Sequence, residues 1–133
     1  MPAVVADTHV LIWYLFDDAG LSVAASEALG QAAAAGDPIY VSAITLVEVT
    51  YLQERGRIRP ETTPRLDRAL REPQPEIVLV PVGGDIARAL RLVPRDVVPE
   101  MPDRIIVATA LYLNVPLVTR DQRMRLAQVE TIW

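Results

Sequence analysis

Short apolar runs alternate along this chain with longer stretches of helical spacing. Four largely apolar runs are predicted to be buried strands, at residues 3–6, 39–42, 77–80 and 117–119, and a possible edge strand covers 130–133. Strands that alternate with helices are typical of βαβ units, in which the strands run parallel. The pattern therefore predicts an α/β fold with a mostly parallel central sheet of four to five strands.

The segments between these runs carry helix signals. Helices are predicted at residues 9–16, 22–35, 43–55, 63–71, 83–93, 103–113 and 121–127. Ser22 and Asp85 are expected to cap the helices that they begin, since short polar side chains accept hydrogen bonds from free backbone N–H groups. The segment from Asp103 to Leu113 has no obvious polar face, which predicts a central helix.

Length and composition favour a single domain over residues 1–133, without repeats or a linker. The chain has 133 residues, of which 51% are hydrophobic, enough for one core. It has no cysteine, which excludes disulfides, a thiolate nucleophile and cysteine-bound zinc. The N-terminal residues lack the pattern of a signal peptide, and no apolar run approaches a membrane span. We therefore expect a cytoplasmic protein that does not enter a membrane.

Four carboxylates stand where a predicted strand ends or a helix begins: Asp7, Glu48, Asp103 and Asp121. Ligands of open α/β sheets bind beyond the carboxyl ends of the strands, so these acids are expected to meet in one pocket. Carboxylates gathered there repel one another unless a positive charge lies between them. Oxygen-rich acidic sites suit Mg²⁺ or Mn²⁺. The four acids therefore predict metal-assisted hydrolysis of a phosphodiester.

Each acid also has a structural interpretation. Asp7, Asp103 and Asp121 can each cap the helix that follows. Glu48 lies on a mostly apolar helix face, with Thr45 three positions before it, and can pair there with an arginine. Taken singly, the acids leave both interpretations open, and their joint placement favours the metal site.

Five segments carry a family resemblance. They are Asp7–Trp13, Ser42–Glu48, Gly56–Ile58, Asp103–Ala110 and Val118–Asp121. In this order and spacing they resemble the PIN-domain ribonucleases, and among them the VapC toxins of bacterial toxin–antitoxin pairs. Gly56–Ile58 carries arginine where relatives carry lysine, which keeps the charge. The resemblance implies a three-layer α/β/α fold in which the four acids above are the family's acidic positions.

The predicted activity is that of an Mg²⁺- or Mn²⁺-dependent endoribonuclease. Asp7 and Asp103 are expected to be the main metal ligands, with Glu48 and Asp121 completing the pocket partly through water. This route does not use the 2′-hydroxyl, so it predicts 3′-hydroxyl and 5′-phosphate ends. The alternatives are a housekeeping RNA-processing nuclease and a non-catalytic module that binds RNA or protein.

The resemblance also implies partners. An antitoxin protein would pack across the helices near the pocket and block it. A homodimer is expected as well, with the apolar stretch Val10–Phe16 as a contributor. Two other enzyme classes fit poorly: His9 stands where haloacid-dehalogenase phosphatases need a second acid, and receiver domains need a lysine that this chain lacks.

Several polar residues beside the acids are secondary candidates. Three hydroxyls could orient water or a phosphate, with strand-end capping as the alternative: Thr8, Ser42 and Thr119. Arg104 is expected to pair with an acid or a phosphate. His9, the only histidine, is expected to face water at a helix start rather than to shuttle protons.

The charge balance argues against a broadly basic RNA-binding surface. The net charge is −4, and all thirteen basic residues are arginine. Two divalent cations would offset this charge. The arginines cluster at positions 55/57/59, 65/68/71 and 120/123/125, either as RNA contacts or as solvated helix faces. At 5% aromatics, Trp13, Tyr14 and Trp133 are interpreted as core or interface rather than base-stacking residues.

Overall fold

A parallel sheet of five strands forms the centre of the molecule. The computed structural model describes residues 2–133. Its strands are β1 (Val4–Ala6), β2 (Ile39–Ser42), β3 (Ile77–Val80), β4 (Leu117–Val118) and β5 (Thr131–Ile132). Their order is β3-β2-β1-β4-β5, and every neighbouring pair is parallel. The predicted α/β class is confirmed, and β5 is the predicted edge strand.

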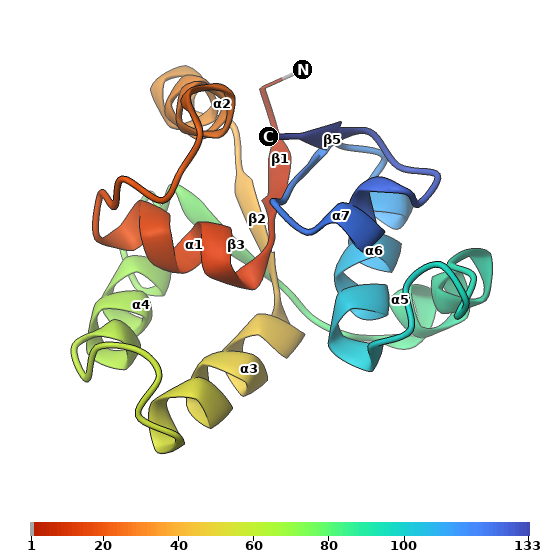
Figure 1. Ribbon diagram of the computed structural model, residues 1–133. Coiled ribbons are helices and arrows are strands. Elements are labelled where there is room, and N and C mark those ends of the chain that lie inside the picture. The colour runs from red at the N-terminus through yellow and green to blue at the C-terminus, as the bar shows by residue number, and fades with distance from the viewer. Residues whose placement is uncertain (1) are drawn as a thin grey trace.

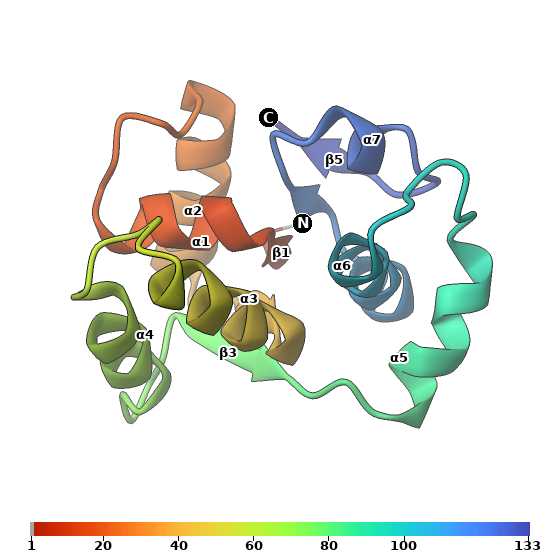
Figure 2. The ribbon, with the colours of Figure 1, turned by 60° about the horizontal axis from the view of Figure 1, so that its bottom comes forward.

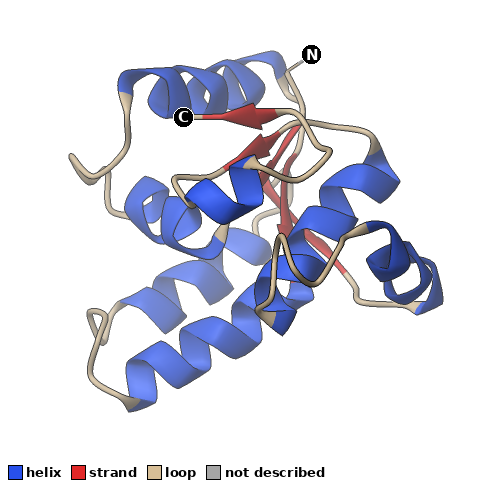
Figure 3. Ribbon diagram, turned by 45° about the vertical axis from the view of Figure 1, so that its right-hand side comes forward, coloured by secondary structure: helices blue, strands red, loops and turns tan. Residues whose placement is uncertain are grey.

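Seven α-helices connect and cover the strands. They are α1 (Thr8–Leu15), α2 (Val23–Ala35), α3 (Ala43–Glu54), α4 (Thr62–Leu70), α5 (Gly84–Ala89), α6 (Met101–Leu113) and α7 (Gln122–Arg125), and a 3₁₀ turn (Leu90–Leu92) follows α5. In Figure 1, α1, α2 and α4 lie to the left of the sheet and α5, α6 and α7 to the right. Figure 3 shows the strands enclosed between these helices. The arrangement is the expected three-layer α/β/α.

The central strand β1 supplies side chains to both layers. Val4 and Ala6 belong to the core shared with α1 and α2, whereas Val5 belongs to the core shared with α6. Successive residues of a strand point to opposite faces, so an entirely apolar strand must have helices on both sides. This is why β1 is apolar throughout and why the first polar residue, Asp7, marks the edge of the sheet.

Local signals set several helix ends. The Ser22 hydroxyl accepts a hydrogen bond from the Ala25 N–H at 3.1 Å, as predicted for a cap of α2. The predicted central helix is confirmed, because residues 105–110 of α6 are all buried. Asn114 ends α6 with φ = +54°, in the left-handed region that asparagine tolerates.

The predicted cap at Asp85 is wrong. Gly83 precedes α5 without a side-chain cap, and Asp85 lies inside the first turn. Its carboxylate accepts hydrogen bonds from the Arg88 guanidinium at 2.7 Å and the Tyr112 hydroxyl at 3.0 Å. Tyr112 belongs to α6, so a contact between helices, which local sequence does not reveal, replaces the cap.

The apolar stretch Val10–Phe16 contributes to the core of the protomer. Val10, Leu11 and Ile12 are buried, residues 13–16 are half-buried, and Tyr14, Leu15 and Phe16 pack against the core. The expected role of this stretch in a homodimer stays a prediction. Within residues 2–133, no helix combines the length and the apolar character that crossing a membrane requires.

Candidate active site

The four candidate acids meet in one cavity. Asp7 follows β1, Glu48 lies in α3 just after β2, Asp103 lies in the first turn of α6, and Asp121 precedes α7 after β4. All four line a cavity of ≈ 680 Å³, together with Thr8, His9, Trp13, Arg120, Gln122 and Arg123. Residues more than a hundred positions apart therefore converge at the carboxyl edge of the sheet, as the strand order requires.

Asp7 is held by two hydrogen bonds. Its Oδ1 accepts from the Thr8 backbone N–H at 2.7 Å, and its Oδ2 accepts from the Thr119 hydroxyl at 2.7 Å. The buried Thr119 hydroxyl also accepts from the Asp121 backbone N–H at 3.0 Å. Thr119 thus joins the residues that follow β1 and β4, and it fixes Asp7 relative to Asp121.

Asp121 is a helix cap as well as a cavity residue. Its Oδ1 accepts hydrogen bonds from the backbone N–H groups of Arg123 at 2.8 Å and Met124 at 3.2 Å. Asp103 differs, because Glu100 is the residue before α6 and no side-chain cap bond is formed there. The capping interpretation therefore accounts for one oxygen of Asp121 and leaves Asp103 free to face the cavity.

Glu48 is held by a relay of hydroxyl groups. The Thr8 hydroxyl donates to Glu48 Oε1 at 2.6 Å, and the Thr8 and Thr45 hydroxyl oxygens lie 2.9 Å apart. Because the single proton of Thr8 goes to Glu48, Thr45 is the donor to Thr8. The role of Thr45 was not predicted. Its spacing of three residues before Glu48 was the available signal, since it places both side chains on one helix face.

No arginine neutralises these acids. The one ion pair within 4.0 Å in the described part of the chain joins Arg88 to Asp85, outside the cavity. The alternative pairing of Glu48 with an arginine is therefore not present. A half-buried set of carboxylates without an ion-paired arginine is costly, because the carboxylates are partly desolvated and repel one another.

The cost of burying these carboxylates together raises the pKa of three of them. Burial raises the pKa of Asp7, against the hydrogen bonds from Thr119 and Thr8, and burial also raises the pKa of Glu48. For Asp103, burial followed by the charges of Asp7, Asp121 and Glu48 raises the pKa to about 7. The pKa of Asp103 thus responds to the charges of the other three acids, and the cavity favours uptake of positive charge, either as protons or as a cation.

Two secondary candidates have structural partners. The Ser42 hydroxyl accepts from the Ile44 N–H at 3.2 Å and begins α3, which is the capping alternative. Arg104 was expected to pair with an acid or a phosphate. Its guanidinium instead donates to the carbonyl oxygens of Val93 (2.9 and 3.1 Å) and Leu90 (3.1 Å). These bonds satisfy carbonyl groups in and just after the 3₁₀ turn, and Arg104 is not among the residues that line the cavity of the four acids.

The donor set fits a hard divalent cation in chemistry. Four carboxylates and nearby hydroxyl groups offer only oxygen ligands, which Mg²⁺ and Mn²⁺ prefer. Among residues 2–133, no group of three or more histidine, cysteine, aspartate or glutamate side chains forms a ready-made metal site. Mg²⁺ usually keeps several waters and binds directly to one or two carboxylates, so it does not need such a group.

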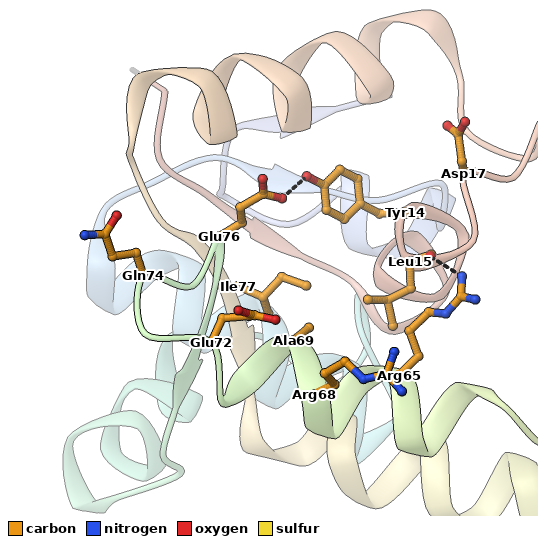
Figure 4. A pocket seen from close by; sticks show the side chains of 10 residues that line it. All are labelled: Tyr14, Leu15, Asp17, Arg65, Arg68, Ala69, Glu72, Gln74, Glu76 and Ile77. Atoms are coloured by element: carbon orange, nitrogen blue, oxygen red, sulfur yellow. Dashed lines mark hydrogen bonds between the residues drawn. The ribbon is translucent and has the colours of Figure 1, made fainter.

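A cavity of ≈ 640 Å³ lies at the opposite end of α1, beside the start of β3 (Figure 4). The Tyr14 hydroxyl donates there to Glu76 at 2.6 Å, and burial together with that carboxylate raises the pKa of Tyr14. Acidic and basic side chains are interspersed along it, at Asp17, Arg65, Arg68 and Glu72. Because this mixed charge favours neither an anion nor a cation, the four-acid cavity is the better candidate.

A three-layer α/β/α fold with four acids gathered at one edge of its sheet defines a class of protein. Residues 4–130 match the family model of the PIN domain, and the chain belongs to the PIN-domain family. One curated relative is Ribonuclease VapC22 of Mycobacterium tuberculosis, which is 32% identical over 125 residues, covering 94% of this chain and 92% of the relative.

Solved structures agree on the fold. A chain of VapBC2 from Rickettsia felis, bound to a DNA fragment from their promoter, has a TM-score of 0.71 at 14% identity, covering 97% of this chain and 96% of that one. A toxin–antitoxin complex from Klebsiella pneumoniae has a TM-score of 0.64 at 23% identity, covering 98% and 96%. FitAcB from Neisseria gonorrhoeae has a TM-score of 0.64 at 21% identity, covering 96% and 95%.

Proposed function

We propose that this protein is a metal-dependent endoribonuclease that hydrolyses RNA phosphodiester bonds. The observation that carries the proposal is the meeting of Asp7, Glu48, Asp103 and Asp121 in one cavity without an arginine partner. The 32% identity to a ribonuclease over nearly the whole chain supports RNA as the substrate.

The four acids would bind Mg²⁺ or Mn²⁺ in two different ways. Asp7 and Asp103 are the main ligands, and Glu48 and Asp121 complete the pocket. Thr119 orients Asp7, and the Thr45–Thr8 relay orients Glu48, so that both carboxylates are fixed before substrate arrives. A bound divalent cation supplies positive charge for the attacked phosphate and lowers the pKa of water.

The chain lacks the two histidines that a metal-free ribonuclease of the two-histidine type uses for attack by the 2′-hydroxyl, since His9 is the only histidine here. The metal-assisted route proposed above does not use the 2′-hydroxyl. His9 is exposed at the mouth of the cavity. We therefore expect products with 3′-hydroxyl and 5′-phosphate ends. End-specific labelling of the fragments checks this, and 2′,3′-cyclic phosphates would contradict it.

Asp7→Asn tests the site directly. Mutation of a residue that hydrogen-bonds to a metal ligand typically lowers metal affinity or activity roughly 10- to 100-fold. Loss of a ligand itself should therefore lower RNA cleavage by more than about a hundredfold. Cleavage of total RNA with Mg²⁺ measures the effect, and Asp85→Asn, outside the cavity, is the matched control. An Asp7→Asn variant as fast as the wild type refutes the site.

The cellular role that we propose is that of a toxin inhibited by a cognate antitoxin protein. The support is the similarity to VapC22 and a fold shared with chains of toxin–antitoxin complexes. Induced expression should arrest growth, and co-expression of a protein encoded by the neighbouring gene should restore it. Harmless expression of an enzyme that cleaves RNA in vitro would favour a housekeeping nuclease instead.

A further inference from the structure

A second cavity adjoins the acidic one along α1. It has a volume of ≈ 300 Å³ and shares His9 and Trp13 with the cavity of the four acids. We call it the flanking cavity; its other lining residues are Ile12, Phe16, Asp18, Thr62 and the run 56–59. Figure 2 shows the α3–α4 connection, which carries that run, lying beside α1. A chain-like ligand bound at the acids would therefore continue into the flanking cavity.

The flanking cavity is positively charged. Gly56, with φ = +67°, ends α3 in a conformation that favours glycine, and the chain turns so that Arg57 and Arg59 line the cavity. Neither arginine has a carboxylate within 4.0 Å in the described structure. The one acid on the lining, Asp18, accepts a hydrogen bond from the Gly20 N–H at 2.8 Å. Two guanidinium groups are thus available to an anion.

Flat surfaces accompany this charge. The guanidinium carbon of Arg59 lies 4.5 Å from the centroid of the Phe16 ring, a cation–π distance, and that of Arg65 lies 4.4 Å from the same centroid. The Trp13 indole packs against the rings of Trp133 and His9, with centroids 5.9 and 6.0 Å away, and a Cβ added at Gly20 would lie 2.9 Å from it. Trp13 also lines both cavities, and nucleobases stack on indole rings and on guanidinium groups.

A buried hydroxyl group also lines this cavity. Thr62 is fully buried, and its Oγ1 has no hydrogen-bond partner among the described residues. An unpaired buried hydroxyl costs stability in the free protein. Because Thr62 has no exposed surface, a polar group of a ligand reaches this hydroxyl only when the lining of the cavity shifts. The unpaired hydroxyl is an observation independent of the arginines, in the lining of the same cavity.

We propose that the flanking cavity binds a nucleotide of single-stranded RNA next to the one whose phosphate lies at the four acids. This subsite rests on the proposed function and names its substrate as unpaired RNA. Arg57 binds the phosphate, Trp13 and the Arg59 plane flank the base, and the Thr62 hydroxyl bonds to a polar group of the nucleotide. A base can occupy this position only when it is unstacked, so the subsite selects single strands over duplex.

Nucleic acid fits these observations better than an acidic peptide. Both ligands would use Arg57 and Arg59, but a peptide carboxylate gains nothing from the flat Trp13 surface. Continuity with the cavity proposed for a phosphodiester also favours RNA. The peptide remains an outcome of the test.

The experiment measures binding of a fluorescent single-stranded oligoribonucleotide of about ten nucleotides, within the usual site sizes. Binding is measured in EDTA for the wild type, and again on the Asp7→Asn background, which removes one repelling carboxylate and should not cleave. Arg57→Ala should weaken binding and reduce the slope of log K against log salt by about 0.7, the value for one phosphate contact. Arg59→Ala should weaken binding roughly 5- to 100-fold through lost stacking.

Thr62→Val separates a ligand role from a structural one. It should weaken binding about two- to tenfold, as expected for one hydrogen bond, and raise the Tm of the free protein by removing the unpaired hydroxyl. A lowered Tm with unchanged binding would mean that Thr62 has only a structural role. Arg91→Ala, in the 3₁₀ turn, carries the same change of charge and should bind like the wild type.

The outcomes distinguish this subsite from the proposed function. Variants at Arg57, Arg59 and Thr62 that bind like Arg91→Ala overturn the subsite even if RNA is cleaved. So does a lack of oligonucleotide binding both by the wild type in EDTA and by Asp7→Asn. If the variants at Arg57, Arg59 and Thr62 bind RNA more weakly as expected, but the wild type does not cleave RNA with Mg²⁺, the subsite is supported and the proposed nuclease activity is overturned. A glutamate-rich peptide that binds more tightly than RNA would assign the cavity to a protein partner.

Discussion

At the scale of single residues, Thr119 should control activity without touching the substrate. Thr119→Val removes the bond to Asp7 and the acceptor for the Asp121 N–H, while it keeps the side-chain shape. Because the hydroxyl orients a proposed ligand, kcat should fall about 10- to 100-fold with little change in KM. Thr119→Ser keeps the hydroxyl and should restore most of the rate. A serine variant as slow as the valine variant would contradict this role.

Asp103 should make the metal-free protein less stable as pH rises. Its pKa is raised from 3.8 to about 7, so the folded protein holds a proton that the unfolded chain releases. The stabilising contribution is complete below about pH 4, declines as pH rises through 7, and is absent above that.

Asp103→Asn cannot ionise and should remove this decline. The gain for the metal-free chain at pH 8 should be about 1–4 kcal/mol, from 1.36 kcal/mol per pKa unit, and it should vanish near pH 4. This exceeds the ~0.3–1 kcal/mol that a carboxylate contributes at a helix N-terminus. Urea unfolding in EDTA at several pH values provides the measurement. A constant difference between wild type and variant from pH 4 to pH 8 would refute the assignment.

At the scale of helices and strands, Arg104 should stabilise the protein rather than act in catalysis. Its guanidinium joins α6 to the 3₁₀ turn through the carbonyl oxygens of Leu90 and Val93. Arg104→Met keeps the packing but removes these bonds, so the free energy of unfolding should fall by about 2–3 kcal/mol. The kcat per folded molecule should stay within about twofold of the wild type. Arg95→Met, at an exposed arginine in the next loop, is the control.

A large loss of activity at unchanged stability would instead indicate that Arg104 contacts an acid or a substrate phosphate, as expected from the sequence. Urea unfolding and the fraction of active molecules, measured on the same preparation, separate these two results.

Elements and acids were predictable from sequence to different degrees. The inner strands β1, β2 and β4 and the helix α6 were predictable because their apolar pattern reflects burial on both sides. The convergence of the acids followed from parallel topology, since strand ends must share an edge. The partners of Asp85 and Arg104 were not predictable, because Tyr112 and the carbonyls of the 3₁₀ turn become neighbours only when α5 and α6 pack. The Thr45 relay likewise depends on the approach of α1 to α3.

At the scale of the whole molecule, net charge conceals an uneven distribution. A net charge of −4 argued against RNA binding, yet the acids gather in one cavity while Arg57 and Arg59 line its neighbour. Cation binding should reverse the local sign and let a phosphodiester approach. Aromatic residues are few, but the Trp13 indole borders both cavities while it packs against Trp133, so the stacking role proposed for it stays a prediction.

Mg²⁺ or Mn²⁺ should therefore stabilise the folded protein. A ligand that binds only the folded state adds about 2.7 kcal/mol at a hundredfold excess over Kd, so Tm should rise with added cation. The rise should be larger at pH 8 than at pH 6, because Asp103, with its pKa near 7, then competes less with protons. Asp7→Asn should lose most of the rise, whereas Asp85→Asn, outside the cavity, should keep it. An equal rise in wild type and Asp7→Asn would place the cation elsewhere on the protein and separate the four acids from metal binding.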